Sequence, residues 1–513
     1  MTDATLIRAL ESPGVYDHPV DKVDLVETHI SWVLLAGDYA YKIKKPVSLP
    51  FVDFSTLERR KKFCDEELRL NRRLAPSLYL GVVPIGGSAA APTLGHGTPI
   101  DYAVKMRRFP SDERLDRRLA RGAVNAADIG ALARTVAEFH ASLEPAPADT
   151  RLGSAAIVVR NALNNLRDLE QAASDADLDT VSRLHEWTER ACVRLEGVFS
   201  DRKKGGAIRE GHGDLHLENL VYLGGEIAAF DALEFDPELR WMDVMNEAAF
   251  LVTDLIAHER PDLAHVFLSR YLEVTGDYAG LEVLRFYLVY RALIRAKVAG
   301  IRSARDGGGA AGQSAYIAHA ARMSARRGRP LLMITHGLSG SGKTTVTGAL
   351  IGPLQAVRIR SDLERKRLHG LAPDADSGSA VGAGLYDENA NRETYAALER
   401  YAAVALRAEV DVIVDAAFLR RAERAEFAAL AERCDARFLM LDLACPERVL
   451  RERIAKRQAA LADASEAGTG VLDHQLSRAE PLADDELASA VRIDTSGRID
   501  PAALARRIAS AAA

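Results

Sequence analysis

The stretch from Leu331 to Ile351, LLMITHGLSGSGKTTVTGALI, decides the fold of the C-terminal part of the chain. A short apolar run, Leu331–Thr335, leads into the loop Gly337-Leu-Ser-Gly-Ser-Gly-Lys-Thr344, and a helical pattern continues from Val346. The loop fits the spacing G-x-x-x-x-G-K-[ST] in the strand–loop–helix setting that this motif requires. Backbone N–H groups of such a loop turn inward around phosphate oxygens, and the helix N-terminus adds a positive dipole. The stretch therefore predicts a nucleotide-binding loop.

Two side chains at the end of this loop have expected roles in catalysis. Lys343 should reach the β- and γ-phosphates and assist the transfer, and the Thr344 hydroxyl should be a ligand of Mg²⁺. ATP and Mg²⁺ are thus the predicted cofactors. The residues expected to bind the nucleotide are Gly337, Ser339, Gly340, Ser341, Gly342, Lys343, Thr344 and Thr345.

Short apolar runs alternate with long amphipathic helices on both sides of this loop. Strands that alternate with helices imply a parallel sheet with helices on both faces. We therefore predict a three-layer α/β domain over residues 331–513. The predicted strands are Leu331–Thr335, Ala356–Ile359, Val410–Val414, Phe438–Leu443 and Ala490–Ile493.

Acidic residues follow two of these strands. Asp415 ends a buried strand, where a second group on the Mg²⁺ side belongs, and Asp362 comes just after another, with Arg365 one helical turn later. Ligands of open parallel sheets bind at the carboxyl ends of the strands. Asp362 is therefore a candidate base for an attacking hydroxyl, and Arg365 a candidate partner of substrate charge. The alternative for Asp362 is an ordinary helix N-cap.

The segment from Pro446 to Arg457 carries four arginines on a predicted helix. Arg453 and Arg457 are four residues apart and share one face, which would close over the triphosphate as a lid and stabilise charge during transfer. The alternative is a solvated basic helix. Together these features resemble P-loop kinases of small molecules or polynucleotide 5′-hydroxyls, including the zeta-toxin and polynucleotide-kinase relatives. The resemblance implies an adenylate-kinase-like sheet, with Asp362 as the base or as a group that orients the substrate.

The part before this domain has a different plan. Strand patterns (Trp32–Leu35, Tyr39–Ile43, Gly81–Pro84 and Tyr102–Met106) surround one helix, Leu57–Leu74, and long helical patterns follow them. A β-rich lobe before a larger helical lobe is typical of a bilobal kinase. We predict this domain over 1–305 and a linker over 306–330, which begins with the glycine-bearing run from Asp306 to Gly312.

The segment His212-Gly-Asp-Leu-His-Leu-Glu-Asn219 has the spacing of a kinase catalytic loop. Asp214 would accept the hydroxyl proton, and Asn219 would be a metal ligand. Asp231 ends a strand twelve residues after Asn219 and is the expected second metal ligand. Upstream, Lys42 lies on a strand, and Glu67, or its neighbour Glu66, on the following helix would hold this lysine against the phosphates.

This order resembles the aminoglycoside-phosphotransferase-like superfamily, which includes sugar, choline and fructosamine kinases, and in which Asp243 would be the later structural acid. One departure is that Gly37 is the only glycine between Glu27 and Lys42, so a glycine-rich phosphate loop is missing there. The whole chain resembles bacterial proteins in which such a domain is fused to a P-loop domain.

Composition limits the other possibilities. The 513 residues carry a net charge of −6, which provides no general basic field for nucleic acid or an anionic membrane and leaves at most a 5′ end as a nucleic-acid partner. The four cysteines show no C-x-x-C spacing, so we expect neither zinc nor disulfides. With no signal-peptide pattern and no 18-residue apolar run, a cytoplasmic location and no membrane partner are expected.

Two main hypotheses follow. The first is an ATP-dependent phosphotransferase with two Mg·ATP sites, which transfers phosphate to hydroxyl groups of small molecules such as sugars, amino sugars or nucleotide-like acceptors. The second is a pseudokinase or ligand sensor in the first domain that regulates a P-loop kinase acting on a small molecule or a nucleic-acid 5′-hydroxyl. The missing glycine-rich loop motivates the second hypothesis.

Overall fold

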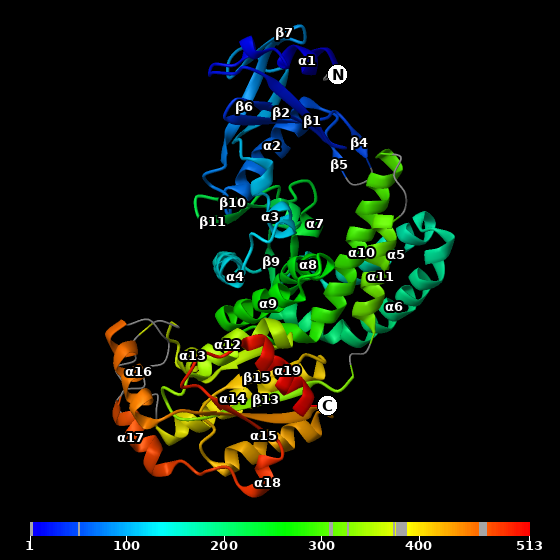
Figure 1. The fold of residues 1–513 in the computed structure, drawn as a ribbon. Coiled ribbons are helices and arrows are strands. Elements are labelled where there is room, and N and C mark those ends of the chain that lie inside the picture. The colour runs from blue at the N-terminus through cyan, green and yellow to red at the C-terminus, as the bar shows by residue number, and fades with distance from the viewer. Residues whose placement is uncertain are drawn as a thin grey trace. The chain divides into compact units, whose positions relative to one another are not determined.

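The computed structural model describes residues 4–49, 52–306, 311–325, 328–372, 375, 387–460 and 469–512. Packing divides the chain into two compact units, which we describe separately (Figure 1). The first comprises Met1–Leu132, Phe139–Ala162 and Phe199–Asp254, and the second Ala133–Glu138, Leu163–Val198 and Leu255–Ala513. The domain limits expected from the sequence, 1–305, 306–330 and 331–513, stay a prediction.

The first unit contains a six-stranded antiparallel sheet in the order β1-β2-β3-β8-β6-β7. The four predicted strands are confirmed, and the edge strands β1 and β7 were not predicted from the sequence. Helix α2 (Leu57–Asn71) packs on β6 and β8 and buries Cys64 and Leu70 against them. The strand bounds are β1 Val23–Glu27, β2 Ser31–Ala36, β3 Tyr39–Lys44, β6 Tyr79–Ser88, β7 Ala91–Leu94 and β8 Asp101–Arg107.

The remaining strands of the first unit form short pairs. The strands β10 and β11 pair after the predicted catalytic loop, β12 pairs with β9 before it, and β4 pairs with β5. Helix α8 begins at Val244, directly after β12. The bounds are β4 Ser48–Leu49, β5 Val52–Asp53, β9 Ile208–Glu210, β10 Leu220–Leu223, β11 Glu226–Ala229 and β12 Trp241–Asp243.

Helices make up most of the chain between these strands and the second sheet. The helical patterns expected there are confirmed, with shifts of a few residues at their ends. None of the helices in the described part of the chain is long and apolar enough to cross a lipid bilayer. The bounds are α1 Ala4–Leu10, α3 Leu115–Ala120, α4 Ala126–Ser142, α5 Ala155–Ala172, α6 Asp175–Lys204, α7 Pro237–Arg240, α8 Val244–Ala257, α9 Pro261–Thr275, α10 Leu281–Asp306 and α11 Ala311–Ser324.

The second unit contains a five-stranded parallel sheet in the order β14-β15-β13-β16-β17. All five predicted strands are confirmed, so the predicted α/β fold class holds for this part. The central strand β13 is flanked on both sides and is almost wholly buried, as expected for a parallel sheet. The bounds are β13 Leu331–His336, β14 Val357–Arg360, β15 Val412–Asp415, β16 Arg437–Ala444 and β17 Ala490–Asp494.

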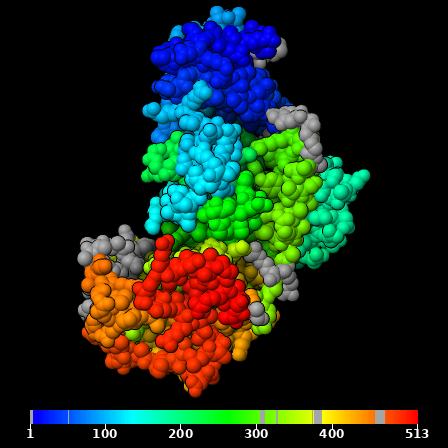
Figure 2. Space-filling model, in the orientation of Figure 1, coloured from blue at the N-terminus to red at the C-terminus, as the bar shows by residue number. Residues whose placement is uncertain are grey.

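Helices cover this sheet and complete three layers (Figure 1). Helix α12 follows the phosphate-binding loop and packs with the last helix, α19, over one apolar cluster that includes Leu350 and Ile508. Helices α14 and α15 pack against one another and against the strands. Figure 2 shows the segment that follows β17 (red) at the surface of this unit. The bounds are α12 Lys343–Leu354, α13 Ser361–Leu368, α14 Glu388–Arg407, α15 Arg421–Arg433, α16 Glu447–Ala460, α17 Thr469–Arg478, α18 Asp484–Leu487 and α19 Pro501–Ala511.

Helix α9, which the sequence places in the first domain, packs directly on α12 and β14. The approach is close at Gly352, where an added Cβ would lie 3.2 Å from the carbonyl oxygen of Asp262. Helices α10 and α11 also pack together in this unit, around a cluster that includes Leu293 and Ile317. The second unit therefore contains helices from both sides of the predicted linker.

Candidate active sites

The phosphate-binding loop, residues 337–344, joins the end of β13 to the start of α12. Gly340 and Gly342 have φ values of +82° and +85°, which residues with a Cβ rarely adopt. A Cβ at residue 340 would also lie 2.8 Å from the carbonyl oxygen of Leu450. The backbone turn therefore favours glycine at both positions, and the neighbouring helix α16 leaves no room for a side chain at residue 340.

Lys343 folds back over its own loop. Its Nζ donates hydrogen bonds to the carbonyl oxygens of Gly337 and Leu338, both at 2.9 Å. This places a positive charge above a loop whose N–H groups and helix dipole already favour an anion. The Ser341 hydroxyl is buried beneath the loop and lacks a hydrogen-bond partner within the described residues. The arrangement suits a phosphate group.

Asp415 lies at the end of β15 and is almost fully buried. Its Oδ2 accepts a hydrogen bond from the Thr347 hydroxyl of α12 at 3.0 Å, and the guanidinium of Arg358 on β14 lies 3.8 Å away. Thr344 lies in the first turn of α12, the helix that carries Thr347. Its side chain lines the same cavity as Asp415. A carboxylate and a hydroxyl are the hard oxygen ligands that Mg²⁺ prefers.

No group of three or more His, Cys, Asp or Glu side chains in the described ranges could hold a metal ion alone. This fits Mg²⁺, which usually takes one or two protein ligands and completes its shell with water and phosphate oxygens. The residues present therefore fit a metal that arrives with a nucleotide.

Asp362 occupies the second position of α13, and the residue at the N-cap position is Arg360. The capping alternative for Asp362 is therefore wrong, because the residue lies inside the helix. Among the described residues, none donates a hydrogen bond to the Asp362 carboxylate. The Asp362 side chain lines the same cavity as Lys343. Arg365 is buried one turn later and donates to Asn391 Oδ1 at 3.1 Å.

The predicted lid helix is α16. The Arg453 guanidinium donates to the carbonyl oxygens of Thr495 at 2.5 Å and Gly340 at 3.4 Å, so it is already held against the phosphate-binding loop. Arg457 lies on the same helix, but its side chain is outside the described residues. A contact not predicted from the sequence comes from α17, where Gln475 Oε1 accepts a hydrogen bond from the Ser339 N–H at 2.8 Å.

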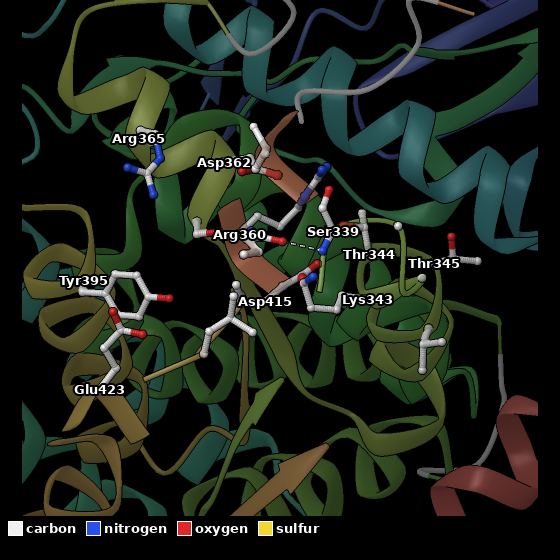
Figure 3. A pocket seen from close by; sticks show the side chains of 18 of the residues that line it. Ser339, Lys343, Thr344, Thr345, Arg360, Asp362, Arg365, Tyr395, Asp415 and Glu423 are labelled. Carbon is white, nitrogen blue, oxygen red and sulfur yellow. Dashed lines mark hydrogen bonds between the residues drawn. The ribbon is translucent and has the colours of Figure 1, made fainter. Parts of the chain in front are cut away.

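A cavity of about 1590 Å³ brings these groups together (Figure 3). Ser339, Gly340, Gly342, Lys343, Thr344, Thr345, Asp362, Arg365, Asp415 and Arg453 line it, whereas Gly337 and Ser341 do not. Tyr395 and Glu423, which were not predicted, also line the cavity. Burial raises the pKa of the Glu423 carboxyl.

The predicted catalytic loop of the first unit connects β9 to β10. Asn219 Nδ2 donates to Asp214 Oδ2 at 3.0 Å, and His216 Nε2 lies 3.3 Å from the same oxygen. His212 Nε2 lies 3.0 Å from the carbonyl oxygen of Phe230 and must carry the proton, because a carbonyl can only accept. Burial lowers the pKa of His212, which is consistent with a neutral ring.

Two carboxylates of α8 hold this loop from behind. Glu247 accepts the N–H groups of His212 at 3.0 Å and Gly213 at 2.6 Å, and Asp254 accepts that of Leu217 at 2.9 Å. Asp243 is a buried structural acid, as the family resemblance implies, but it pairs with Arg202 at 2.6 Å. Sequence reasoning did not assign the loop-holding role to Glu247 or Asp254.

Lys42 on β3 pairs with Glu67, as expected, and also with Asp231, which was predicted only as a metal ligand. Its Nζ lies 2.8 Å from Glu67 and 2.5 Å from Asp231, whereas Glu66 pairs with Arg69 and Arg240. Burial opposes the charge on Lys42, but Asp231 and Glu67 outweigh it and hold its pKa well above the usual value. The ion pair thus stays charged at neutral pH.

Asp231 itself has a left-handed backbone, with φ of +61°. This conformation costs of order 1–3 kcal/mol for a residue other than glycine and clusters at functional sites. It is held by Tyr79, whose hydroxyl accepts the Asp231 N–H at 3.0 Å, and by Asn71, which accepts the next N–H at 2.8 Å. The backbone therefore presents the Asp231 carboxylate toward Lys42.

The connection between β1 and β2 is a tight turn. The Thr28 N–H donates to the Ser31 carbonyl oxygen at 2.9 Å, and the Thr28 hydroxyl accepts the Ser31 N–H at the same distance. Lys45 donates to Glu27 and to the Thr28 carbonyl oxygen, both at 2.5 Å. The backbone N–H of Ser31 is thus already used, in keeping with the absence of a glycine-rich loop from the sequence.

The pKa of Glu247 gives a testable pH dependence. Burial raises it, but His140, His212 and the Gly213 N–H lower it more, from 4.5 to about 2. Because the folded value is depressed, the stabilisation is present above pH 4.5 and is lost as the pH falls through 2. We expect Glu247→Gln to remove on the order of 3 kcal/mol at neutral pH, and less as the pH approaches 2.

Hydrogen exchange of the amides of His212 and Gly213 at several pH values measures this effect. The exposed carboxylate Glu226 provides the matched control, and Glu226→Gln should leave the exchange unchanged. Equal loss of protection in Glu247→Gln at pH 3 and at pH 7 would contradict the assigned cause.

Residues 332–482 match a protein family described as an AAA domain. The protein Rv2004c of Mycobacterium tuberculosis, described as uncharacterised, is 32% identical over 402 residues, which cover 78% of this chain and 79% of that protein. The protein Mb2027c of Mycobacterium bovis, with the same description, matches to the same extent.

Two solved structures are also similar in part. The amicoumacin kinase hAmiN, in complex with AMP-PNP, Ca²⁺ and Ami, is 13% identical with a TM-score of 0.41, covering 63% of this chain and 94% of that one. A putative kinase of Chloroflexus aurantiacus is 20% identical with a TM-score of 0.29, covering 35% of this chain and 97% of that one.

Proposed function

The chain belongs to the family of the mycobacterial protein Rv2004c, and from its two candidate sites we propose that it is an ATP-dependent phosphotransferase. Each site would bind one Mg·ATP and transfer the γ-phosphate to a hydroxyl group of a small molecule. Sugars, amino sugars and nucleotide-like compounds are the proposed acceptor classes. No partner beyond ATP and this acceptor is needed for the proposal.

One observation carries it. Lys343, Thr344, Asp415 and Asp362 come from three strand ends of one parallel sheet and line one cavity. Phosphate, metal and hydroxyl groups must lie within a few ångströms of one another for in-line transfer, which depends mainly on positioning and charge stabilisation. The cavity provides a group suited to each of these three tasks.

In the proposed reaction of the second unit, the phosphate-binding loop holds the triphosphate through its N–H groups, and Lys343 turns from its loop carbonyls to the β- and γ-oxygens. Asp362 accepts the proton of the acceptor hydroxyl as the new O–P bond forms and the bond to ADP breaks. Thr344 and Asp415 would hold Mg²⁺, which would supply positive charge next to the phosphates. Arg453 and Arg457 complete the positive surroundings of the transferred group.

In the first unit the same tasks fall to different residues. Lys42, positioned by Glu67, binds the α- and β-phosphates, and Asp231 and Asn219 hold the metal ion. Asp214 takes the hydroxyl proton, and its carboxylate is already oriented by the amide of Asn219. The neutral His212 holds the catalytic loop to Phe230.

The variant Asp362→Asn tests the proposal for the second unit. It removes the proton acceptor and keeps the size of the side chain, so phosphate transfer should fall by a factor of about 10² or more while ATP binding changes little. Transfer is measured as radiolabelled phosphate moved from ATP to a panel of sugars, amino sugars and nucleosides. The exposed Asp484→Asn variant is the matched control. Absence of transfer to every acceptor by the wild type would count against the proposal.

One observation favours a second function for the first unit. The tight turn between β1 and β2 uses its own N–H groups, which fits a nucleotide sensor without turnover. This pseudokinase would regulate the P-loop kinase of the second unit. Turnover that survives Asp362→Asn and Lys343→Ala but is lost in Asp214→Asn would exclude it.

A further inference from the structure

Arg358 is a fully buried cation on β14 that the proposed reaction does not use. Only 1% of its surface is exposed, and it is one of the largest fully buried side chains of the described chain. A buried charge is costly unless it is paired and hydrogen-bonded. The partners of this guanidinium therefore indicate why a charge is retained there.

On one side, Arg358 contacts the first turns of α12. Its Nη1 donates to the Thr344 carbonyl oxygen at 2.8 Å and to the Thr347 hydroxyl at 3.0 Å. The Thr347 hydroxyl has a single proton, which it shares between the Lys343 carbonyl oxygen at 2.9 Å and Asp415 Oδ2 at 3.0 Å. Arg358 thus contacts the backbone of one proposed metal ligand and, through one hydroxyl, fixes an oxygen of the other.

On the other side, Arg358 contacts helix α9. Its Nε donates to Glu273 Oε1 at 2.7 Å, and Arg270 Nη1 donates to Glu273 Oε2 at 2.7 Å. The backbone N–H of Arg358 donates to the buried Ser269 hydroxyl at 2.9 Å. Burial raises the pKa of Glu273, but Arg358 and Arg270 outweigh it and keep that pKa below the usual value. The carboxylate that holds Arg358 is therefore ionised.

We propose that Arg358, held by Glu273 of α9, is a positioning residue for the metal side of the P-loop site. It keeps Thr344 and Asp415 in register across α12 and β15. Helix α9 lies outside the predicted P-loop domain, so that domain depends on a helix from the preceding part of the chain. The inference rests on the proposed assignment of Thr344 and Asp415 to Mg²⁺.

The sign of the effect separates positioning from simple charge. Arg358 is a cation 3.8 Å from Asp415, so removing its charge alone would make the site more negative and strengthen Mg²⁺ binding. Removing a positioning residue would instead weaken it, because partners behind metal ligands typically contribute a factor of about 10 to 100 in metal affinity or activity. The two roles therefore predict changes in opposite directions.

The experiment is calorimetric titration of ATP into the full chain, with and without Mg²⁺. The ratio of the two affinities at the Lys343-dependent site is the metal coupling. We expect this ratio to fall roughly 10- to 100-fold in Arg358→Met, less in Arg358→Lys, which keeps a donor, and in the same direction in Glu273→Gln. Thr347→Val removes the hydroxyl that joins Arg358 to Asp415 and keeps the guanidinium in place, so it still tests the proposal if Arg358→Met does not fold.

Ser269→Ala is the matched control. It loses a buried hydrogen bond to the same residue without touching the guanidinium, so stability should fall and the metal coupling should stay as in the wild type. Unchanged coupling in Arg358→Met and Thr347→Val, or stronger coupling in Arg358→Met, would overturn the inference. Absence of Lys343-dependent ATP binding in the wild type would instead contradict the proposed function.

Discussion

We expect Lys343→Ala to weaken nucleotide binding at the P-loop site and to lower phosphate transfer by the second unit. In the ligand-free loop the Lys343 ammonium spans the carbonyl oxygens of Gly337 and Leu338, so it is stored within reach of an incoming phosphate. Alanine removes the only side-chain cation of the loop itself, residues 337–344. Loss of one such preorganised donor to the transferred group lowers turnover by about 10²- to 10³-fold.

Calorimetry with Mg·ATP and the phosphate-transfer assay measure this effect on the full chain. Lys456→Ala removes the same charge from an exposed position on α16 and is the matched control. A second ATP site, in the first unit, should be unaffected in Lys343→Ala. Wild-type affinity in this variant would show that the cavity binds something other than a nucleotide.

Asp214→Asn should remove turnover by the first unit while its nucleotide binding remains. The carboxylate is about 38% exposed, and one of its oxygens is held by Asn219 and His216. An amide has the same shape but cannot take a proton from an attacking hydroxyl, so we expect a loss of about 10²- to 10⁴-fold in turnover. Asp231→Ala should instead weaken Mg·ATP binding.

Single-turnover transfer from radiolabelled ATP, in the background of Lys343→Ala, isolates this site. Asp149→Asn is an exposed control within the same unit. An unchanged rate in Asp214→Asn would exclude the assigned base. A wild-type first unit that binds ATP without turnover would support the sensor hypothesis.

The second sheet shows what local sequence predicts well. Its five strands are short and mostly apolar, with β14 the main exception because it contains Arg358 and Arg360. The motif that begins at Gly337 needs only eight consecutive residues to be recognised. Asp362 and Asp415 were found because they follow such strands, and parallel strands end at one edge. Local patterns were sufficient in each of these cases.

Long-range partners were not predictable in the same way. Glu247 lies 35 residues from the His212 N–H that it accepts, and Glu273 lies 85 residues from Arg358. The sequence alone does not distinguish a carboxylate that is buried in the fold from one at the surface. Edge strand β1 was not predicted for another reason. Its exposed Leu25 and Val26 break the alternation of apolar and polar residues that is typical of a half-buried strand.

The packing of α9 on the second sheet bears on how such a gene was assembled. The glycine-bearing linker suggests a junction at which two coding segments were joined. Ser269 and Glu273, however, lie before this linker and are hydrogen-bonded to Arg358 on β14, which lies after it. Recombination within the linker would join the P-loop segment to a different preceding segment, which would lack these two side chains. The P-loop segment therefore keeps its buried contacts only when it is inherited together with α9. A recombination that preserves these contacts would have its crossover upstream of α9.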